Sequence, residues 1–414
     1  MIEQSLKDWL QRLESRHPVE IDLGLERVAA VAQKLGLLER HIHTFSIAGT
    51  NGKGSVATVL TAGLLANGFS VGTYTSPHLR RFNERILIDG EEVDDAAIVA
   101  AFEAVEVARK AISLTYFETT TLAALWLFRE RAVDQQVLEV GLGGRLDAVN
   151  IIDADVSVIT SIGLDHTDWL GDTREVIAVE KAGIARNDRP CIVADVDPPA
   201  TLAAALLERG ARAQYFGRDW QISEGELKTV EGRIVQLPEP LGLLESNIGA
   251  ALQAMESSGV GEITDGLLEA VSKVRLAGRL SVLEVNGLRV ILDVAHNTES
   301  VRRLVDFLRK DPCQNVTRAI MGVMRDKPVR DMIAACAGVF EDWRVVDLCD
   351  VPRAMAATHL ADEIGPERVV AAGAFNEVWA DVLCNCQPGD RIVIFGSFFT
   401  VGEAFDLLAQ SRGI

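Results

Sequence analysis

The chain has 414 residues, of which 48% are hydrophobic and 24% charged, and its formal net charge is −19 at pH 7. This composition excludes a disordered chain, and the acidic balance argues against binding to nucleic acid or to anionic membranes. The length leaves room for two or three domains with a large core. Six scattered cysteines without a metal-type CxxC pair predict a reduced compartment, so we expect a cytoplasmic protein.

The N-terminal segment, residues 1–16, places Leu6, Trp9, Leu10 and Leu13 at helical spacing among charged residues. This pattern predicts an amphipathic surface helix rather than a targeting segment. The longest uncharged run, residues 54–79, is interrupted by Asn-Gly and predicts a helix followed by a strand, without a membrane span.

The most informative segment runs from Ser46 to Ser55 and contains three glycines and one lysine. It joins an expected strand over 44–48 to an expected helix that begins at Lys53. Glycines let backbone N–H groups surround an anion, and the helix N-terminus and the lysine add positive charge, which predicts ATP binding. The strict pattern G-x-x-x-x-G-K-[ST] is not met, since its first glycine falls on Ile47. The alternative is a plain glycine-rich turn.

Short apolar strands alternate with amphipathic helices along the chain, which predicts an α/β fold with a mostly parallel sheet covered on both faces. Ligands of such sheets gather beyond the carboxyl ends of the strands, where the polar motifs of this chain begin. The expected strands are 44–48, 70–74, 136–140, 156–162 and 191–194, and the expected helices are 53–66, 94–110, 117–131 and 174–185.

Residues 215–240 predict a small β insertion, and a second alternating series begins at Leu288. Its strands are expected at 288–294, 318–323, 345–348, 368–371 and 391–395, with helices such as 298–309 and 329–338 between them. We therefore expect an N-terminal domain over 1–276 with a P-loop-type sheet, a linker over 277–287, and a C-terminal Rossmann-like domain over 288–414.

Three side chains stand out beside the loop, each with a structural alternative. Glu139 lies within an apolar strand, where a buried carboxylate needs an ion pair or a metal. His166 follows Asp165 and could belong to a helix-capping turn. Lys181, near the end of a helix, could be an ordinary solvated lysine.

The loop Gly49-Thr50-Asn51-Gly52-Lys53-Gly54-Ser55 resembles that of ATP-dependent amide ligases, which include folylpolyglutamate and muramyl-peptide enzymes. The later motifs resemble a folylpolyglutamate synthase of the Mur ligase superfamily. They are Ser76-Pro77-His78-Leu79, Phe82-Asn83-Glu84-Arg85, Tyr116-Phe117-Glu118, residues 139–147, Gly163-Leu164-Asp165-His166, Glu180-Lys181-Ala182-Gly183, Gly278-Arg279 and residues 293–297. Asp22-Leu23-Gly24-Leu25 and Leu146-Asp147-Ala148 resemble the bacterial bifunctional form that is also a dihydrofolate synthase.

This resemblance implies two Mg²⁺ sites, held by Ser76, Glu139 and His166, and a monovalent cation. It also implies that Lys181 is carboxylated on its amine, as N6-carboxylysine, and that Arg279 acts like an arginine finger. The catalytic set is then Lys53, Lys181, His166, Glu139 and Arg279. The ATP-binding set is Gly49, Asn51, Gly52, Lys53, Gly54, Ser55, Asn247, Arg279 and Asp293, with His296 nearby; Asn247 could alternatively cap a helix.

For the pterin substrate the resemblance points to Asp22, Leu23, Gly24, Leu25, Thr115, Tyr116, Phe117, Glu118, Leu146, Asp147 and Ala148. Phe117 can stack on a heteroaromatic ring and Asp147 can accept hydrogen bonds from it. The structural alternatives are that Phe117 starts a helix core and that Asp147 caps a turn. Ser397 and Lys327 are candidates for binding glutamate.

The implied reaction is the ATP-dependent addition of L-glutamate to dihydropteroate and to tetrahydrofolate, through an acyl phosphate, by a monomer. A muramyl-peptide ligase would share the mechanism but needs a uridine-nucleotide-binding N-terminal domain, and about 43 residues precede the first expected strand here. A P-loop switch would explain the lysine loop but neither a second α/β domain nor the pterin-like motifs.

Overall fold

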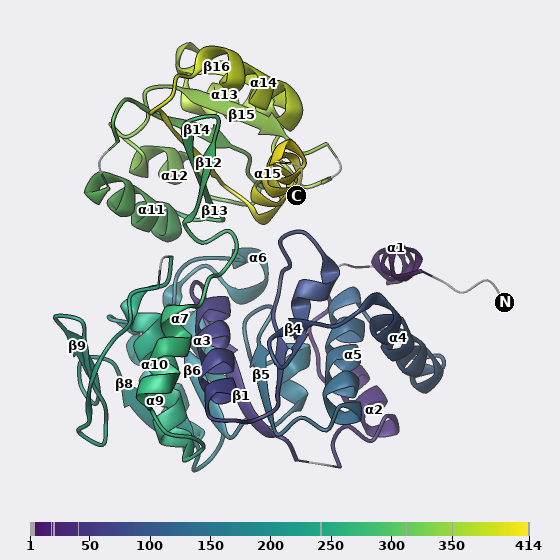
Figure 1. Ribbon diagram of the computed structural model, residues 1–414. Helices are drawn as coiled ribbons and strands as arrows, with labels where there is room; N and C mark the ends of the chain where they lie inside the picture. Colours follow the sequence, from purple (N-terminus) through teal and green to yellow (C-terminus); the bar gives the residue numbers. More distant parts are fainter. Residues whose placement is uncertain are drawn as a thin grey trace. The chain divides into compact units, whose positions relative to one another are not determined.

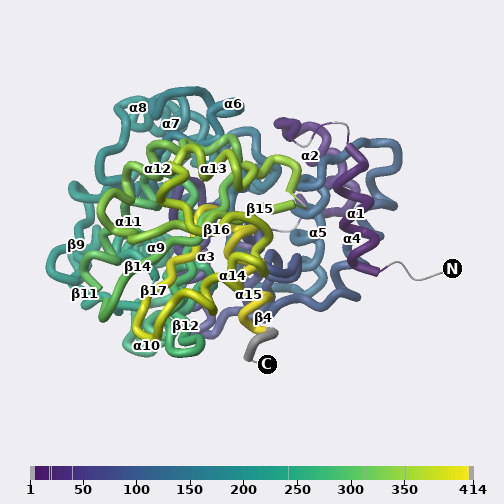
Figure 2. Tube along the Cα trace, turned by 90° about the horizontal axis from the view of Figure 1, so that it is seen from above, coloured from purple at the N-terminus to yellow at the C-terminus, as the bar shows by residue number. Residues whose placement is uncertain are grey.

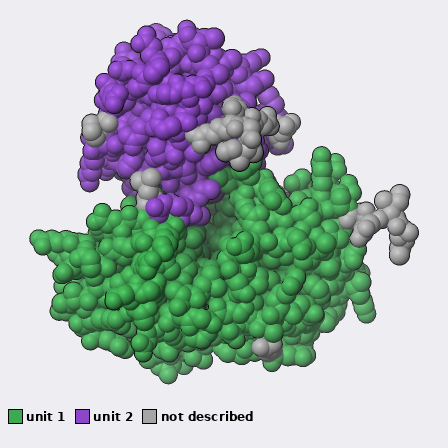
Figure 3. All heavy atoms as spheres, viewed as in Figure 1, with its two compact units in different colours: residues 1–274 green, residues 275–414 purple. Residues whose placement is uncertain are grey.

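The computed structural model describes residues 5–17, 19, 21–39, 41–240, 242–311, 313–349 and 351–412. It forms two compact units, Met1–Val274 and Arg275–Ile414, which Figure 3 shows in green and purple. Each unit is built around its own mostly parallel sheet, so the predicted α/β fold class is confirmed. Among the described residues, none of the helices combines the length and the apolarity that crossing a membrane requires.

The main sheet of unit 1 has eight strands in the order β4-β3-β2-β5-β1-β6-β7-β8 (Figure 1). Strands β2 and β5 to β8 run parallel with β1, while β3 and β4 form an antiparallel edge. The central strands are buried along almost their whole length, as is typical of a parallel sheet with both faces covered. The bounds are β1 (His43–Ala48), β2 (Val71–Tyr74), β3 (Ile86–Ile88), β4 (Glu91–Glu92), β5 (Gln135–Glu139), β6 (Val156–Ile159), β7 (Pro190–Val193) and β8 (Arg212–Tyr215).

Two groups of helices cover the faces of this sheet. Helices α1, α2, α4 and α5 pack on one side and belong to one core, as Figures 1 and 2 show, while α3, α9 and α10 belong to the other. Neighbouring residues of β5 point to opposite faces, so Val137 joins the second core and Leu138 the first. The helices are α1 (Leu6–Arg16), α2 (Glu26–Lys34), α3 (Lys53–Ala66), α4 (Asp95–Arg109), α5 (Tyr116–Glu130), α6 (Thr167–Leu170), α7 (Arg174–Ala182), α8 (Ala200–Glu208), α9 (Glu245–Ser258) and α10 (Asp265–Ser272), with short 3₁₀ helices η1 (Phe82–Arg85) and η2 (Ala148–Ile151).

The expected N-terminal helix is α1, which begins after Ser5 with a reciprocal capping box to Asp8. It buries Leu6, Trp9 and Leu13, as its apolar spacing predicted. The expected β insertion is a three-stranded antiparallel sheet of β9 (Gln221–Ser223), β10 (Glu226–Lys228) and β11 (Ile234–Gln236).

Unit 2 has a six-stranded sheet in the order β12-β13-β17-β14-β15-β16, parallel except for β12. Strand β12 lies within residues 277–287, which the sequence pattern had suggested as a linker, and it pairs with β13 along its whole length. The strands are β12 (Ser281–Val285), β13 (Leu288–Asp293), β14 (Thr317–Met321), β15 (Trp343–Asp347), β16 (Val369–Ala374) and β17 (Arg391–Phe395), and the helices are α11 (Thr298–Lys310), α12 (Val329–Ala335), α13 (Ala357–Ile364), η3 (Pro366–Arg368), α14 (Phe375–Asn385) and α15 (Phe398–Arg412).

Candidate active site

The glycine-rich loop between β1 and α3 needs its glycines because its backbone lies very close to side chains of neighbouring segments. A Cβ on Gly49 would lie 1.7 Å from Oγ1 of Thr160, and a Cβ on Gly52 would lie 2.6 Å from Oδ1 of Asn247. Gly52 also has φ +92° and occupies the N-cap position of α3. The first turn of α3 is therefore open to an anion and uncovered by side-chain caps, as phosphate binding requires.

The same loop is joined to the segment that follows β6. The N–H of Thr50 donates to the Ser161 carbonyl (2.7 Å), and the N–H of Asn51 donates to Oγ of Ser161 (3.1 Å). Oγ1 of Thr50 accepts from the N–H of Gly163 (3.0 Å). The loop and residues 160–163 therefore form one connected structure.

Lys53, Glu139 and Ser76 come together at the carboxyl ends of neighbouring strands. Nζ of Lys53 lies 3.2 Å from the Gly49 carbonyl oxygen and 4.0 Å from Oε1 of Glu139. Glu139 is only 4% exposed, and its Oε2 accepts from the backbone N–H of Ser76 (3.1 Å). The buried carboxylate is thus partly balanced by a lysine, as the ion-pair alternative expected, but it stands beside the loop that would hold phosphates. Ser55, also buried, lies in the first turn of α3.

Lys181 is buried in α7, at 3% exposure, which rules out the solvated-lysine alternative. Burial, together with the positive charge of Lys53, lowers the pKa of its ammonium to about 7, while the negative charge of Asp165 opposes the shift. The side chain sits there because α7 packs closely on the glycine run after β5: a Cβ on Gly144 would lie 2.8 Å from the Glu180 carbonyl oxygen. The fold therefore brings a lysine whose amine is readily neutral close to Lys53.

His166 immediately precedes α6 and adopts φ +52°. Its side chain is exposed and makes no capping hydrogen bond to α6, while its backbone N–H donates to Oδ1 of Asp165 (2.9 Å). His166 is therefore the N-cap residue of α6 by its backbone, but its imidazole does not cap the helix.

Two side chains, Asp195 and Arg174, hold the backbone N–H and carbonyl of Ile162 in a clamp. The sequence patterns did not single them out. Oδ2 of Asp195 accepts from the Ile162 N–H (2.6 Å), and Nε of Arg174 donates to the Ile162 carbonyl (2.7 Å). Asp195 follows β7 directly after Ala194, so the rule that polar residues after parallel strands approach the site could have found it. The clamp holds the segment that leads to Asp165 and His166.

Several residues of the pterin-like motifs form a linked group with Arg27. Asp22 pairs with Arg27 (2.6 Å), and Arg27 also pairs with Oε1 of buried Glu118 (3.1 Å). Oε2 of Glu118 accepts from the N–H of Thr115 (2.7 Å), and Thr115 caps α5. Leu23, Gly24 and Leu25 connect this network to α2. Asp22, Thr115 and Glu118 thus brace the start of α5.

Phe117 and Asp147 shape the glycine run after β5. Phe117 covers Gly141 so closely that a Cβ there would lie 2.5 Å from its ring, and Tyr74 lies 6.0 Å away, centroid to centroid. Asp147, 3% exposed, accepts from the N–H groups of Leu142 (2.8 Å) and Val149 (3.0 Å), and burial raises its pKa to about 6. Asp147 therefore caps the turn, as the structural alternative predicts. Leu146 and Ala148 are its neighbours in the sequence.

Asn247 is not a helix N-cap, because α9 begins at Glu245 and its N-cap is Leu244. The amide side chain instead lies against Gly52 and is buried. A helical residue whose amide reaches the glycine loop fits contact with a nucleotide better than it fits capping.

In unit 2, Arg279, Asp293 and His296 gather near Phe398. Both oxygens of Asp293 accept backbone N–H groups, from Leu280 and Ala295 (2.9 Å each), and burial raises its pKa while Arg279 opposes the shift. The guanidinium of Arg279 lies 5.5 Å from the Phe398 ring centroid, and the His296 ring lies 5.9 Å from it. Ser397 caps the start of α15 by accepting from the N–H of Thr400 (3.0 Å).

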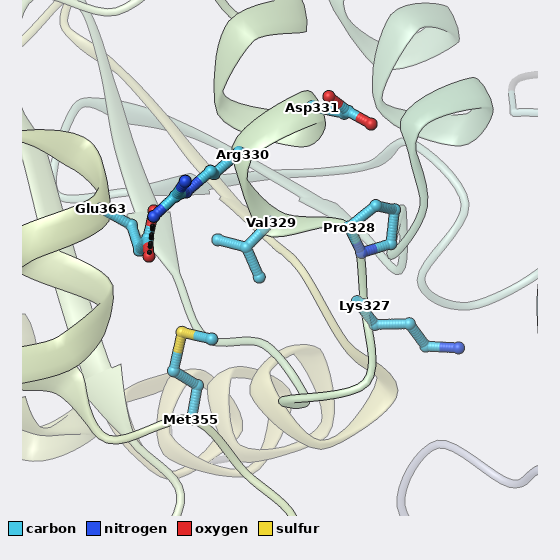
Figure 4. A pocket seen from close by; sticks show the side chains of 7 residues that line it. All are labelled: Lys327, Pro328, Val329, Arg330, Asp331, Met355 and Glu363. Carbon is cyan, nitrogen blue, oxygen red and sulfur yellow. Dashed lines mark hydrogen bonds and ion pairs between the residues drawn. The ribbon is translucent and has the colours of Figure 1, made fainter. Parts of the chain in front are cut away.

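Lys327 borders a hollow of unit 2 that Figure 4 shows. Its side chain points away from the other labelled residues, and its Nζ lies 3.4 Å from Oδ2 of Asp326. Across the hollow, Arg330 pairs with Glu363 (2.7 Å). The lining is Lys327, Pro328, Val329, Arg330, Asp331, Met355 and Glu363.

The donor set beside the loop suits a hard divalent cation that keeps water and phosphate ligands. Glu139 supplies a buried carboxylate and Ser76 a hydroxyl, while the part of the chain that the structure describes contains no group of three or more His, Cys, Asp or Glu that could hold a metal. Mg²⁺ is usually held by one or two carboxylates together with substrate phosphates, so these residues fit it.

Comparison with known proteins identifies the family. Residues 47–232 match the Mur ligase middle domain, and residues 278–398 match the Mur ligase glutamate ligase domain. The chain is 39% identical to the dihydrofolate synthase/folylpolyglutamate synthase of Escherichia coli K12, over 98% of this chain and 96% of that one.

Two solved structures extend this similarity to three dimensions. The E. coli FolC in complex with DHPP and ADP has a TM-score of 0.94 at 39% identity and 99% coverage of both chains. A bifunctional folylpolyglutamate synthase/dihydrofolate synthase with Mn, AMPPNP and L-glutamate bound has a TM-score of 0.91 at 38% identity and 98% coverage of both. The chain therefore belongs to the Mur ligase family and, within it, groups with the dihydrofolate synthase/folylpolyglutamate synthases.

Proposed function

We propose that this protein adds L-glutamate to dihydropteroate and to tetrahydrofolate in an ATP-dependent reaction that releases ADP and phosphate. As a member of its family it is an ATP-dependent amide-forming ligase. The observation that carries the assignment is the approach of Lys53, in an uncapped glycine loop, to buried Glu139, in a chain similar over its full length to such enzymes.

We assign the nucleotide to the loop and the residues against it. The open N–H groups and the positive end of α3 meet the phosphates, Lys53 adds a full charge, and Asn247 closes the loop from α9. These roles rest on the closeness of the Gly49 and Gly52 backbones to their neighbours. The proposed ATP contacts in unit 1 are Gly49, Asn51, Gly52, Lys53, Gly54, Ser55 and Asn247.

We assign Mg²⁺ to Ser76, Glu139 and His166, in two sites, with a monovalent cation beside them. The bound metal would neutralise charge on the transferred phosphoryl group. The surrounding residues position the proposed ligands. The Ser76 N–H holds Glu139 in place, and the clamp on Ile162 positions the segment that carries His166. The burial of Glu139 supports this assignment, because a buried carboxylate retains its charge best beside a cation.

Lys181 is the proposed site of carboxylation. Carbamate formation requires a neutral amine that attacks CO₂, and a lysine with a pKa of about 7 supplies that form near neutral pH. The carbamate would replace a buried positive charge close to Lys53 by a negative one, which removes the repulsion between the two lysines.

The acceptor substrate is assigned to Asp22, Leu23, Gly24, Leu25, Thr115, Tyr116, Phe117, Glu118, Leu146, Asp147 and Ala148. The partly exposed ring of Phe117, which covers Gly141, can stack on a pterin. Asp22, Thr115 and Glu118 serve this site by bracing α5, since their polar atoms already bind one another and Arg27.

In unit 2 we assign Arg279 and Asp293 to ATP, with His296 nearby, and Ser397 and Lys327 to glutamate. The support is that Arg279, Asp293 and His296 lie together, with Asp293 fixed by two backbone N–H groups. The domain roles follow: residues 1–276 would bind ATP and pterin, and residues 288–414 would serve glutamate ligation.

The proposed chemistry is phosphoryl transfer followed by amide formation. The acceptor carboxylate attacks the γ-phosphorus of ATP and displaces ADP. The amine of glutamate then attacks the acyl phosphate and displaces inorganic phosphate. Lys53 and Arg279 stabilise the charge on the transferred group, and exclusion of water protects the acyl phosphate.

The two alternatives are less well supported. A muramyl-peptide ligase shares the family, but the full-length relatives reported above are folate enzymes. A non-ligase P-loop switch does not account for the match of residues 278–398 to a glutamate ligase domain.

The test uses ¹⁸O-labelled dihydropteroate carboxylate. If the carboxylate attacks the γ-phosphorus, one label should leave in inorganic phosphate for each amide formed. ADP formation should continue beyond the first turnover only when acceptor and glutamate are both present. Unlabelled phosphate with normal product would exclude the acyl phosphate, and label in AMP would indicate adenylation. ADP formation without either substrate would favour the switch.

We also propose that the protein works as a monomer in the cytoplasm. All six cysteines are free, which fits a reduced compartment. Size-exclusion chromatography with light scattering tests the monomer, and fractionation of cells that express the native gene tests the location.

A further inference from the structure

Arg85 is a partly buried arginine for which the described parts of the chain offer no acidic partner. It ends η1 and precedes β3, and no hydrogen bond or ion pair of its Nη groups is found among the described residues. An arginine removed from water without a carboxylate is costly, and it is unusual in a chain with a net charge of −19.

The nearest acidic side chain in the sequence, Glu84, is already occupied. Its oxygens accept from the backbone N–H groups of Leu79 (2.6 Å), Arg80 (2.8 Å) and Arg81 (2.8 Å). Three backbone donors satisfy this carboxylate, so it does not turn toward Arg85.

The orientation of the Arg85 guanidinium is nevertheless well defined. Its Nε donates to Nδ1 of His78 (2.8 Å), and its Cζ lies 5.8 Å from the ring centroid of Phe82 and 5.6 Å from that of Tyr116. One edge of the guanidinium is thus held by an imidazole and one face by aromatic rings. The two Nη groups remain as a fork of donors, the geometry that binds a carboxylate through two parallel hydrogen bonds.

The fork lies between two parts of the candidate site. The Arg85 carbonyl accepts from the N–H of Thr75 (2.9 Å), directly before Ser76. On the other side, Tyr116 is followed by Phe117, whose ring covers Gly141. A substrate that stacks its aromatic ring on Phe117 and directs its reactive carboxylate toward Ser76 and Lys53 would therefore lie next to Arg85.

We propose that Arg85, oriented by His78, binds a carboxylate of the acceptor substrate and selects anionic over neutral acceptors. The proposal rests on the proposed function for the identity of the acceptor. Two carboxylates have the required chemistry: the one on the aryl ring of dihydropteroate, and the additional α-carboxylate on the glutamyl tail of tetrahydrofolate.

The test measures equilibrium binding in the presence of Mg²⁺ and AMPPNP, with dihydropteroate and its carboxamide as one pair and tetrahydrofolate and its α-carboxamide as another. In at least one pair, the wild-type protein should bind the carboxylate about 10- to 100-fold more tightly than the carboxamide. This ratio of affinities is what one charge-assisted hydrogen-bonded contact contributes. Arg85→Met should abolish that preference and leave carboxamide binding unchanged. Arg85→Lys, which keeps the charge but loses the fork, should retain part of it.

Arg81→Met is the matched control, because Arg81 lies beside the same 3₁₀ helix but is exposed and pairs with Glu92 and Asp95. It should bind like the wild type. Thermal unfolding and AMPPNP affinity show that each variant is folded with an intact nucleotide site.

The affected pair identifies the carboxylate. Loss of preference within the dihydropteroate pair assigns Arg85 to the aryl carboxylate, and loss within the tetrahydrofolate pair alone assigns it to the α-carboxylate. The proposal would be overturned if Arg85→Met kept the wild-type preference, or if it lost affinity equally for the carboxylate and the carboxamide. Turnover by the wild-type protein would uphold the proposed function in either case. Failure of wild-type protein to bind either acceptor would overturn the proposed function as well.

Discussion

Gly52, the N-cap residue of α3, lies against Asn247 of α9: a Cβ on Gly52 would lie 2.6 Å from Oδ1 of Asn247. Gly52 also has φ +92°, where side chains are strained. The loop is therefore held between α3 and α9, and its geometry depends on both.

Gly52→Ala should weaken AMPPNP binding at least 10-fold, because the new methyl group must displace Asn247 or the loop. Isothermal titration calorimetry measures the change. Gly68→Ala is the matched control, since Gly68 has φ +84° with no atom within 4 Å of its Cβ position. Equal nucleotide affinity in the two variants would show that the contact between Gly52 and Asn247 does not shape the nucleotide site.

Lys181 should make stability depend on pH in CO₂-free buffer. Its pKa is about 7 in the folded protein and near 10.5 when unfolded, so the unfolded chain binds the extra proton between these values. Its contribution to the free energy of unfolding is therefore most unfavourable below pH 7 and improves as the pH rises to about 10. Lys181→Met should lack this slope, which urea unfolding at several pH values measures.

The same lysine should carry a carbamate when bicarbonate is present. Incubation with ¹³C-bicarbonate should give a carbamate resonance in the wild type that Lys181→Met lacks, and the variant should lose turnover. A carbamate signal that persists in the variant would place the modification on another amine, and full turnover in the variant would remove any catalytic role for Lys181.

Asp147→Ala should lower both stability and acceptor binding, because both carboxylate oxygens hold backbone N–H groups of the turn that carries Leu146 and Ala148. We expect a loss of about 1–3 kcal/mol in the free energy of unfolding, with dihydropteroate affinity falling more than AMPPNP affinity. Asp94→Ala is the control, as Asp94 caps α4 by accepting from the Ala97 N–H (2.8 Å). If the nucleotide affinity fell most, Asp147 would belong to the ATP site.

Asp195→Ala should weaken divalent-metal binding through the segment that it positions. The substitution leaves the Ile162 N–H without its acceptor and removes the ion pair between Asp195 and Arg174. The affinity for Mn²⁺ in the presence of AMPPNP, measured by electron paramagnetic resonance, should fall about 10-fold. Asp197→Ala, whose side chain is 91% exposed, should bind Mn²⁺ normally. Lower stability with unchanged Mn²⁺ affinity would limit Asp195 to a structural role.

Local patterns in the sequence determined the elements that carry the site. The glycines and Lys53 predicted a strand, a loop and a helix over 53–66, and α3 has those bounds. Strand alternation placed the motifs after β1, β2, β5 and β6, because successive parallel strands end at one edge of a sheet. These signals are local, since they depend on periodicity, turn residues and helix starts within a few positions.

Only the tertiary structure decided which of these residues meet and how far they are buried. The strand order, with β1 between β5 and β6, brings Lys53 to Glu139, and the packing of α7 on the glycine run buries Lys181. It also set Asn247 against Gly52. Among the residues that the structure describes, it left Arg85 without a carboxylate, because backbone donors occupy Glu84. Burial and pairing between distant segments depend on how whole sheets and helices pack, and the spacing of residues along one segment carries no record of that packing.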